Sequence, residues 1–281
     1  MRARGMGMRR LRDALVGAAG LAISALLLAA LLLVLAYVFY GAALRFEPEM
    51  LLTMGNTTSG GLLNAIVGTW LLSGLALAIS ALLAIFVAID IAQYAGARVG
   101  SLLRATVDTM AAIPAMVYGL FGFLVFVIYL GMGYSLLAGS LTLSLMMIPY
   151  LARSTETAMG NVPKELVAAA YALGASRWQV ISRVLLRFGR PLIISGALLT
   201  VSIGAGETAQ LLYTAGWNPG LPTWFTHSQV GYLTYVVWAG INQPTPYPQG
   251  LAFVASALLV GMILVLLLIS KWLEGREVRR A

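Results

Sequence analysis

One acidic residue stands deep inside an uncharged stretch of this sequence: Glu207, in the segment Gly206-Glu207-Thr208-Ala209. An unpaired charge at the centre of a lipid bilayer costs about 2.5 to 3.5 kcal/mol on insertion scales, so we expect this carboxylate to have a partner or a proton. Two interpretations stay open. Glu207 makes a structural hydrogen bond across a helix bundle, or, together with Thr208, it lines a polar pathway through the membrane. Because a carboxylate repels anions, it would contact an anion only with help, for example from an arginine of another subunit.

Arg153 and Glu156 form a second candidate pair, three residues apart at the end of another uncharged stretch. Residues at this spacing share one face of a helix and can pair when their charges are opposite. One interpretation is an arginine that reaches the membrane surface and pairs there with its neighbour. The other is a gate in the pathway that opens when the helices move. Asp90 and Asp108 flank a short basic loop and are expected to mark the ends of membrane helices.

Several kinds of site are excluded by what the sequence lacks. It has no cysteine, and its single histidine, His227, has no second His or Cys with which to share a metal. The two lysines, Lys164 and Lys271, follow no glycine-rich phosphate-binding loop, so we expect no Walker-type ATP site. Neither His-Glu-x-x-His nor Gly-x-Ser-x-Gly occurs. We therefore expect no catalytic residue, no metal and no cofactor bound by this chain.

These residues are carried by a chain that is 60% hydrophobic and only 10% charged, which is far more apolar than a soluble domain. Its uncharged segments are apolar on every side instead of alternating, which predicts helices and excludes a β-barrel. Each is long enough to cross a bilayer once or twice. The sequence therefore predicts an all-α polytopic membrane protein with about six transmembrane helices. We expect them near residues 15–40, 63–89, 109–130, 135–152, 191–215 and 249–270.

The distribution of positive charge predicts the orientation of these helices. If the chain starts in the cytoplasm, all but one of its 18 Lys and Arg residues, Arg45, fall on the cytoplasmic side. Both termini are therefore predicted to be cytoplasmic, and the net charge of +8 reflects membrane orientation rather than nucleic-acid binding. The basic N-terminus resembles the start of a signal peptide, but its apolar run, residues 14–44, is too long for one, so we expect an uncleaved anchor.

Two connections stand out, one on each side of the membrane. The external loop 216–248 is rich in Trp, Tyr and Pro, which favour the headgroup layer. Pro222 is expected to start a helix there, and Pro244 to Pro248 lead into the last span. This loop is either an aromatic belt at the membrane surface, a docking surface for an external solute-binding protein, or both.

The internal connection 153–190 is predicted to contain two short helices. Pro163 stands in the first turn of one, Gly174 caps its end, and Ser176 with Gln179 forms a capping box for the next. The second helix has an apolar face and an arginine face, so we expect it to lie at the cytoplasmic surface. The arginines face anionic lipid, or the loop forms a knob that a cytoplasmic motor grips.

The internal connection resembles the EAA loop of the permeases of binding-protein-dependent ABC importers. In that family this loop is the coupling helix that sits in a cleft of the ATP-hydrolysing subunit. Two departures are present: Ala168 stands where the motif has Glu, with Glu165 one turn earlier, and the proline expected near Arg187 is missing, although Pro191 is kept. The resemblance implies a set of residues that couple to the ATPase subunit: Glu165, Ala168, Ala169, Ala170, Gly174, Ala175 and Ser176.

From about residue 60 onward the chain resembles the phosphate-importer permeases of the PstA kind. The segments that carry this resemblance, in order, are Gly60-Gly61, Ala65 to Thr69, Ile113 to Gly122, Arg153 to Glu156, Gly206 to Ala209 and Leu211 to Ala215. The resemblance implies the type I ABC importer permease fold and import of phosphate by alternating access. The implied partners are a second homologous permease, two ATP-binding cassette subunits that use ATP and Mg, an extracytoplasmic phosphate-binding protein and membrane lipid, with no nucleic acid. The implied location is the inner membrane of a prokaryote.

This resemblance also defines the expected layout and its alternatives. We expect a basic cytoplasmic tail at 1–14, a first helix and external segment at 15–62, the permease domain at 63–271, and a cytoplasmic tail at 272–281.

Phosphate permeases of this type often have an Arg four residues before the Glu of the Gly-Glu-Thr motif, and that position is Ile203 here. The solute is therefore phosphate or another oxyanion such as sulfate, molybdate or phosphonate. A secondary transporter is a further alternative, which would predict inverted repeats.

Overall fold

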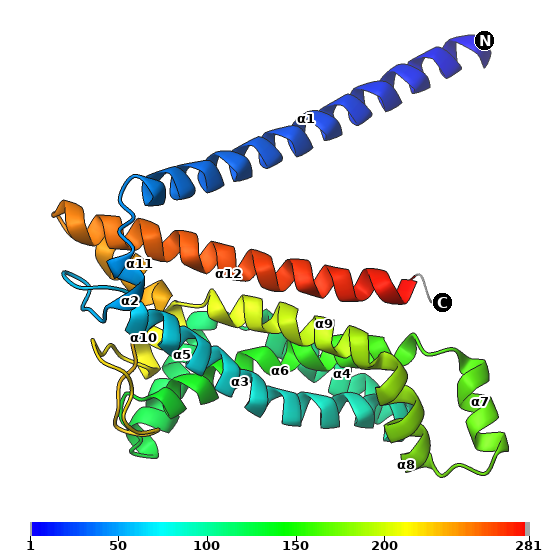
Figure 1. The fold of residues 1–281 in the computed structure, drawn as a ribbon. Coiled ribbons are helices and arrows are strands. Elements are labelled where there is room, and N and C mark those ends of the chain that lie inside the picture. Colours follow the sequence, from blue (N-terminus) through cyan, green and yellow to red (C-terminus); the bar gives the residue numbers. More distant parts are fainter. Residues whose placement is uncertain (1, 279–281) are drawn as a thin grey trace.

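A computed structural model of the chain describes the backbone of residues 2–278 and the side chains of residues 15–275. The described part is almost entirely helical (Figure 1), and its only pairing of β type is an isolated bridge between Gly55 and Gly60. The elements in chain order are α1 Arg2–Ala43, α2 Glu49–Leu52, α3 Leu63–Ile89, η1 Asp90–Tyr94, α4 Ala97–Ala112, α5 Ala115–Gly122, η2 Phe123–Tyr129, α6 Leu136–Gly160, α7 Lys164–Ala172, α8 Arg177–Gln179, η3 Val180–Leu185, α9 Leu186–Ala205, α10 Ala209–Thr214, α11 Leu233–Ile241 and α12 Pro246–Val278. The η elements are π-helical. The all-α prediction is confirmed.

In the part of the chain that the structure describes, five helical segments are long and apolar enough to cross a membrane, and a broken sixth accompanies them. The five are Leu15–Ala43, Leu63–Tyr94, Leu136–Gly160, Arg177–Ala205 and Pro246–Gly275. The sixth consists of Ala97–Ala112 and Ala115–Tyr129, which meet at an angle of 93°. Together they account for the expected number of about six spans.

The prediction of a continuous third helix at 109–130 is wrong. Ile113 and Pro114 have extended backbone angles and form an elbow between α4 and α5. The cause is local, because a proline disfavours helical geometry in the residue before it and lacks an N–H of its own. The Tyr118 hydroxyl donates a hydrogen bond of 2.8 Å to the Met110 carbonyl, which stabilises one backbone group at this break.

The prediction of a fifth helix at 191–215 is wrong at both ends. The helix already begins at Arg177 and continues through η3 into α9, with Pro191 inside it. At the other end it breaks at Gly206, and the short α10 follows at Ala209. The cytoplasmic helix expected as a separate surface element is therefore the first part of a membrane-spanning helix.

Helix α6 is the centre of the bundle. Most of its membrane-spanning window, 72%, is buried, which is the highest share among the spanning helices of the described chain. It packs on α3, α9, α4 and α5. Small residues let these helices approach closely, as is usual in membranes. A Cβ atom at Gly122 of α5 would overlap Thr142 of α6, and one at Gly196 of α9 would overlap Ser154 of α6.

Helix α1 stands apart from the bundle. Figure 1 shows it diverging from α12, and the window of its most apolar residues is 0% buried. Among the described residues its one extensive contact is with α12, where Tyr37 meets the ring of Phe253 edge-on at 5.4 Å. A helix with so much exposed apolar surface is stable only in lipid or against another protein.

We predict that Gly122→Ala destabilises the bundle by about 1 to 3 kcal/mol, because the new methyl group overlaps the buried side chain of Thr142. The matched control is Gly74→Ala in α3, where no atom lies within 4 Å of the new Cβ. The measurement is thermal unfolding of the purified protein in detergent. Equal melting temperatures for the two variants would contradict the close packing of α5 on α6.

Candidate functional site

Arg153 binds two carboxylates toward the C-terminal end of α6. Its Nη2 lies 2.6 Å from both oxygens of Asp108, and its Nε lies 2.9 Å from Asp108 Oδ1. Its Nη1 lies 3.3 Å from Glu156 Oε2, so the predicted pair on one helix face is present. The role of Asp108 was predicted wrongly, because this carboxylate does not simply mark a helix end but joins α4 to α6.

A second arginine completes a four-residue network. Arg104 Nε, also on α4, lies 2.7 Å from the other oxygen of Glu156. Glu156 is the least exposed of the four, with 17% of its side chain accessible, because the two arginines cover it. The network carries two positive and two negative charges and closes the gap between the two helices. Sequence spacing predicted the pair within α6 only, since the residues that bond across α4 and α6 are 45 and 52 positions apart in the chain.

The network belongs to a polar surface on a helix that enters the membrane. The exposed surface of α4 includes Arg104, Asp108 and Thr109, whereas Val107 is buried. Charged groups at membrane depth face water or protein, because contact with lipid is costly. This face of α4 and α6 therefore borders water or another subunit.

Glu207 lies in the break between α9 and α10. Its backbone oxygen accepts a hydrogen bond of 2.9 Å from the Thr234 hydroxyl, and its backbone N–H bonds to the Gly204 carbonyl at 3.1 Å. Its side chain is half-buried, and among the described side chains it has no ion pair or hydrogen bond. Thr208 lines a cavity of about 500 Å³ together with Thr234 and Trp238.

The structure does not bring the two predicted clusters together. Helices α6 and α9 run antiparallel, so that Gly196 contacts Ser154 while Gly204 contacts Met147. Glu207 lies beyond Gly204, about two and a half helical turns from the level of Arg153. The candidate pathway residues therefore occupy two levels along the bundle.

The two broken helices pack on each other at the level of Glu207. Gly119 of α5 lies against Gln210 of α10, and a Cβ added at Gly119 would come within 2.7 Å of the Gln210 Cα. Gln210 is fully buried there. The sequence analysis did not single out Gln210, although a polar residue one turn after Glu207 in an apolar stretch is a signal that could have done so.

The predicted coupling loop forms a protruding knob at the end of the bundle (Figure 1). Helix α7 ends at Ala172, and Gly174 forms the turn after it with a φ of +80°, which is accessible to glycine at low cost. The Ala175 N–H donates to the Ala170 carbonyl at 3.1 Å. The capping box of Ser176 and Gln179 is present. No residue of α7 is buried, so Glu165 and Ala168 to Ala170 all retain accessible surface.

Exposed apolar side chains on this knob were missed by the sequence analysis. Leu173 is 89% exposed, and Tyr171 and Trp178 are 44% and 56% exposed. Behind them Val180 and Ile181 are fully buried against the ends of α3 and α6, so the knob is firmly attached. An exposed leucine beside a rigid glycine turn is typical of a surface that another protein covers.

The loop at residues 216–248, predicted to be external, holds one helix, which does not start where expected. Helix α11 begins at Leu233, while the segment around Pro222 is irregular. Trp217 stacks on Tyr235 at 4.7 Å between ring centroids, and the buried Asn64 donates to the Asn218 carbonyl at 3.0 Å. Trp224 and Phe225 remain exposed. Across the described residues, no cluster of His, Cys, Asp and Glu suited to a metal ion occurs.

Comparisons of sequence and of structure find similar proteins among membrane components of transporters. The family described as "Binding-protein-dependent transport system inner membrane component" matches residues 80–279. The phosphate transport system permease protein PstA 2 of Mycobacterium bovis is 36% identical over 273 residues, 96% of this chain and 91% of that protein. PstA of Haemophilus influenzae is 32% identical over 74% of this chain and 73% of its own length. A solved structure of the MetNI methionine ABC transporter in an inward-facing conformation superposes with a TM-score of 0.60 at 18% identity, covering 77% of this chain and 97% of that chain.

We predict a measurable but small coupling between Asp108 and Arg153. Exposed ion pairs contribute about 0.2 to 1 kcal/mol, and the two side chains are 54% and 44% accessible. The measurement is a double-mutant cycle on the free energy of unfolding with Asp108→Asn and Arg153→Gln. The control cycle combines Asp108→Asn with Arg98→Gln, which should be additive. Additivity in both cycles would argue against the bond between α4 and α6.

Proposed function

This chain belongs to the family of binding-protein-dependent transport system inner membrane components, and on that basis we propose that it is the permease subunit of an ATP-driven phosphate importer. The observation that carries the proposal is the 36% identity to a phosphate transport permease over 96% of the chain. The helical bundle with its polar membrane face and cytoplasmic knob suits this activity. The permease does not hydrolyse ATP in this proposal, and ATP and Mg bind to partner subunits.

The proposed assembly follows from surfaces that the single chain leaves open. A second, homologous permease covers the polar face of α4 and α6, so that the pathway runs between two subunits. Two ATPase subunits grip the knobs, one for each permease, and an external phosphate-binding protein docks on the loop around Trp224 and Phe225. Lipid surrounds the remaining apolar surface in the inner membrane of a prokaryote. Both termini lie in the cytoplasm, which agrees with the excess of Lys and Arg on that side.

The proposed mechanism is alternating access. Closure of the ATPase subunits moves the knob, and η3 transmits this movement directly to α9 because the helix is continuous from Arg177. The network of Arg153, Asp108, Glu156 and Arg104 acts as the gate on the cytoplasmic side. Glu207 and Thr208 contact the solute deeper in the pathway, with an arginine of the second permease as the counter-charge for Glu207.

One position favours a second candidate solute. Ile203 stands where phosphate permeases of this type often have Arg, and it is half-buried against the core of α6. The alternative is another oxyanion carried by the same mechanism. Uptake assays with labelled phosphate, sulfate and molybdate in vesicles containing the complete complex separate these candidates. Carriage of sulfate or molybdate without phosphate would overturn the phosphate assignment and leave the permease assignment intact.

We predict that Gly174→Asp abolishes ATP-dependent uptake in the complete complex without preventing its assembly. Its φ of +80° is strained for any residue with a side chain, so the turn that ends α7 shifts and the contact with the ATPase is lost. The control is Gly160→Asp at the end of α6, where nothing lies within 4 Å of the added Cβ and the backbone has no positive φ. Normal uptake by Gly174→Asp would contradict the proposal that this loop couples the permease to the ATPase subunit.

A further inference from the structure

One buried amide has a hydrogen-bonding capacity that the protein does not use. Among the described side chains three buried polar atoms lack a partner: Thr155 Oγ1, Gln210 Oε1 and Tyr232 Oη. Gln210 is the only amide of the three, and its Nε2 reaches only the sulfur of Met146, at 3.4 Å. A buried carbonyl without a donor is unfavourable and calls for an explanation.

The position of Gln210 points to the solute pathway. It follows Glu207 by three residues, directly after the break between α9 and α10. Discontinuous helices at membrane depth occur where they are buried in protein or line a pathway. Helix α5 covers Gln210 through Gly119, at the point where a side chain on Gly119 would collide with the α10 backbone.

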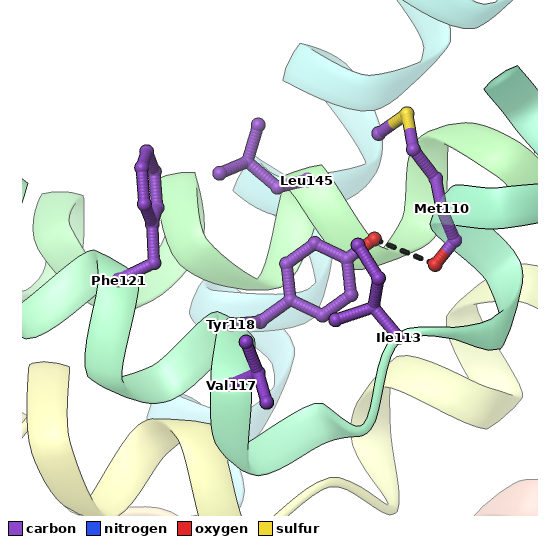
Figure 2. Close-up of a pocket in the computed structure, with 6 residues that line it drawn as sticks. All are labelled: Met110, Ile113, Val117, Tyr118, Phe121 and Leu145. Atoms are coloured by element: carbon purple, nitrogen blue, oxygen red, sulfur yellow. Dashed lines mark hydrogen bonds between the residues drawn. The ribbon is translucent and has the colours of Figure 1, made fainter.

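Helix α5 has the features of a movable cover. It is eight residues long and is bounded on one side by the elbow at Ile113 and Pro114 and on the other by the π-helical η2. Such irregular segments absorb changes in helix direction. Figure 2 shows a cavity beside it, of about 260 Å³, lined by Val117, Tyr118 and Phe121 of α5 and by residues of α4 and α6. This cavity is entirely apolar, so α5 can shift into it without burying a polar group.

The unused atoms define the class of ligand. The Glu207 carboxylate and Gln210 Oε1 are hydrogen-bond acceptors, and neither receives a hydrogen bond from a described side chain. A ligand that satisfies them must bring its own donors. Phosphate keeps at least one proton near neutral pH, whereas sulfate keeps none. The NH₂ group of Gln210 can at the same time donate to a second oxygen of the same anion.

We propose that Gln210 is a specificity-determining contact for a protonated oxyanion, which reaches it when α5 moves into the adjacent cavity. This inference rests on the proposed function and adds to it a residue that selects phosphate over fully ionised anions. A site built to bond a ligand proton discriminates strongly against analogues that lack one, since its acceptor is then left unpaired.

The test uses the complete complex in proteoliposomes, with labelled phosphate, and compares the wild type with Gln210→Met. This variant keeps the length of the side chain and removes the acceptor. We expect kcat/KM for uptake to fall about tenfold or more, as for loss of one well-placed hydrogen bond. Thr155→Val is the matched control, because it removes an equally buried and unpartnered polar atom away from the break. It should retain wild-type uptake.

A second measurement separates loss of phosphate binding from a structural effect of the substitution. The complex without its binding protein is unfolded thermally in equal concentrations of inorganic phosphate or sulfate. Phosphate should protect the wild type and Thr155→Val more than sulfate does, and this difference should disappear in Gln210→Met. If Gln210→Met does not assemble, Gln210→Asn replaces it; its shorter side chain withdraws the amide, so the same loss is expected.

The outcomes are distinct. Unchanged uptake and unchanged phosphate protection in an assembled Gln210 variant overturn the inference. Absence of phosphate uptake by the wild type refutes the phosphate assignment itself, and carriage of sulfate instead refutes both the phosphate assignment and the role of Gln210.

The role of α5 is tested by Ile113→Phe, which fills the cavity: we expect slower uptake with the preference for phosphate over sulfate retained. A wild-type rate in this variant would exclude the movement.

Discussion

The backbone of a membrane protein must find hydrogen-bond partners inside the protein, and this constraint governs the arrangement of the two broken helices. At each break the chain leaves helical geometry within a membrane span, so N–H and C=O groups lose their regular partners. The Tyr118 hydroxyl binds the carbonyl of Met110, and the Thr234 hydroxyl binds that of Glu207. The first bond joins the two halves of one broken span, and the second comes from α11, so each break is supported by a different packed helix.

The same constraint limits where polar and charged side chains can lie in the bundle. Several of the buried hydroxyl groups in the bundle are satisfied within their own helix, as Thr142 and Thr200 are by the carbonyl one turn earlier. Four charged side chains form one network on the face of α4 and α6: Arg104, Asp108, Arg153 and Glu156. We therefore expect a solute that crosses this bundle to meet polar groups along the face of α4 and α6 and at the breaks.

The sequence predicted the helices better than their interruptions. Hydropathy and length identified the spans around α1, α3, α6 and α12, because a lipid environment demands long apolar segments. The caps at Gly174 and Ser176 were also predicted, since they depend on residues within one turn. Pro114 was visible in the sequence but its 93° elbow was not, because the angle is set by packing against α6 and α10. The contact of Asp108 with Arg153 and the orphaned amide of Gln210 depend on tertiary structure, which local spacing does not contain.

The isolation of α1 has a consequence for the order in which the protein is made. Its one extensive contact within the described chain is with α12, the last helix. Roughly 200 residues separate the two, and at about 5 to 20 residues per second their synthesis takes about 10 to 40 seconds. During that time α1 must persist as a single helix in lipid, which its 29-residue apolar segment allows. Helix α1 therefore docks on the bundle only after α12 has been made, although it precedes α12 in the chain by about 200 residues.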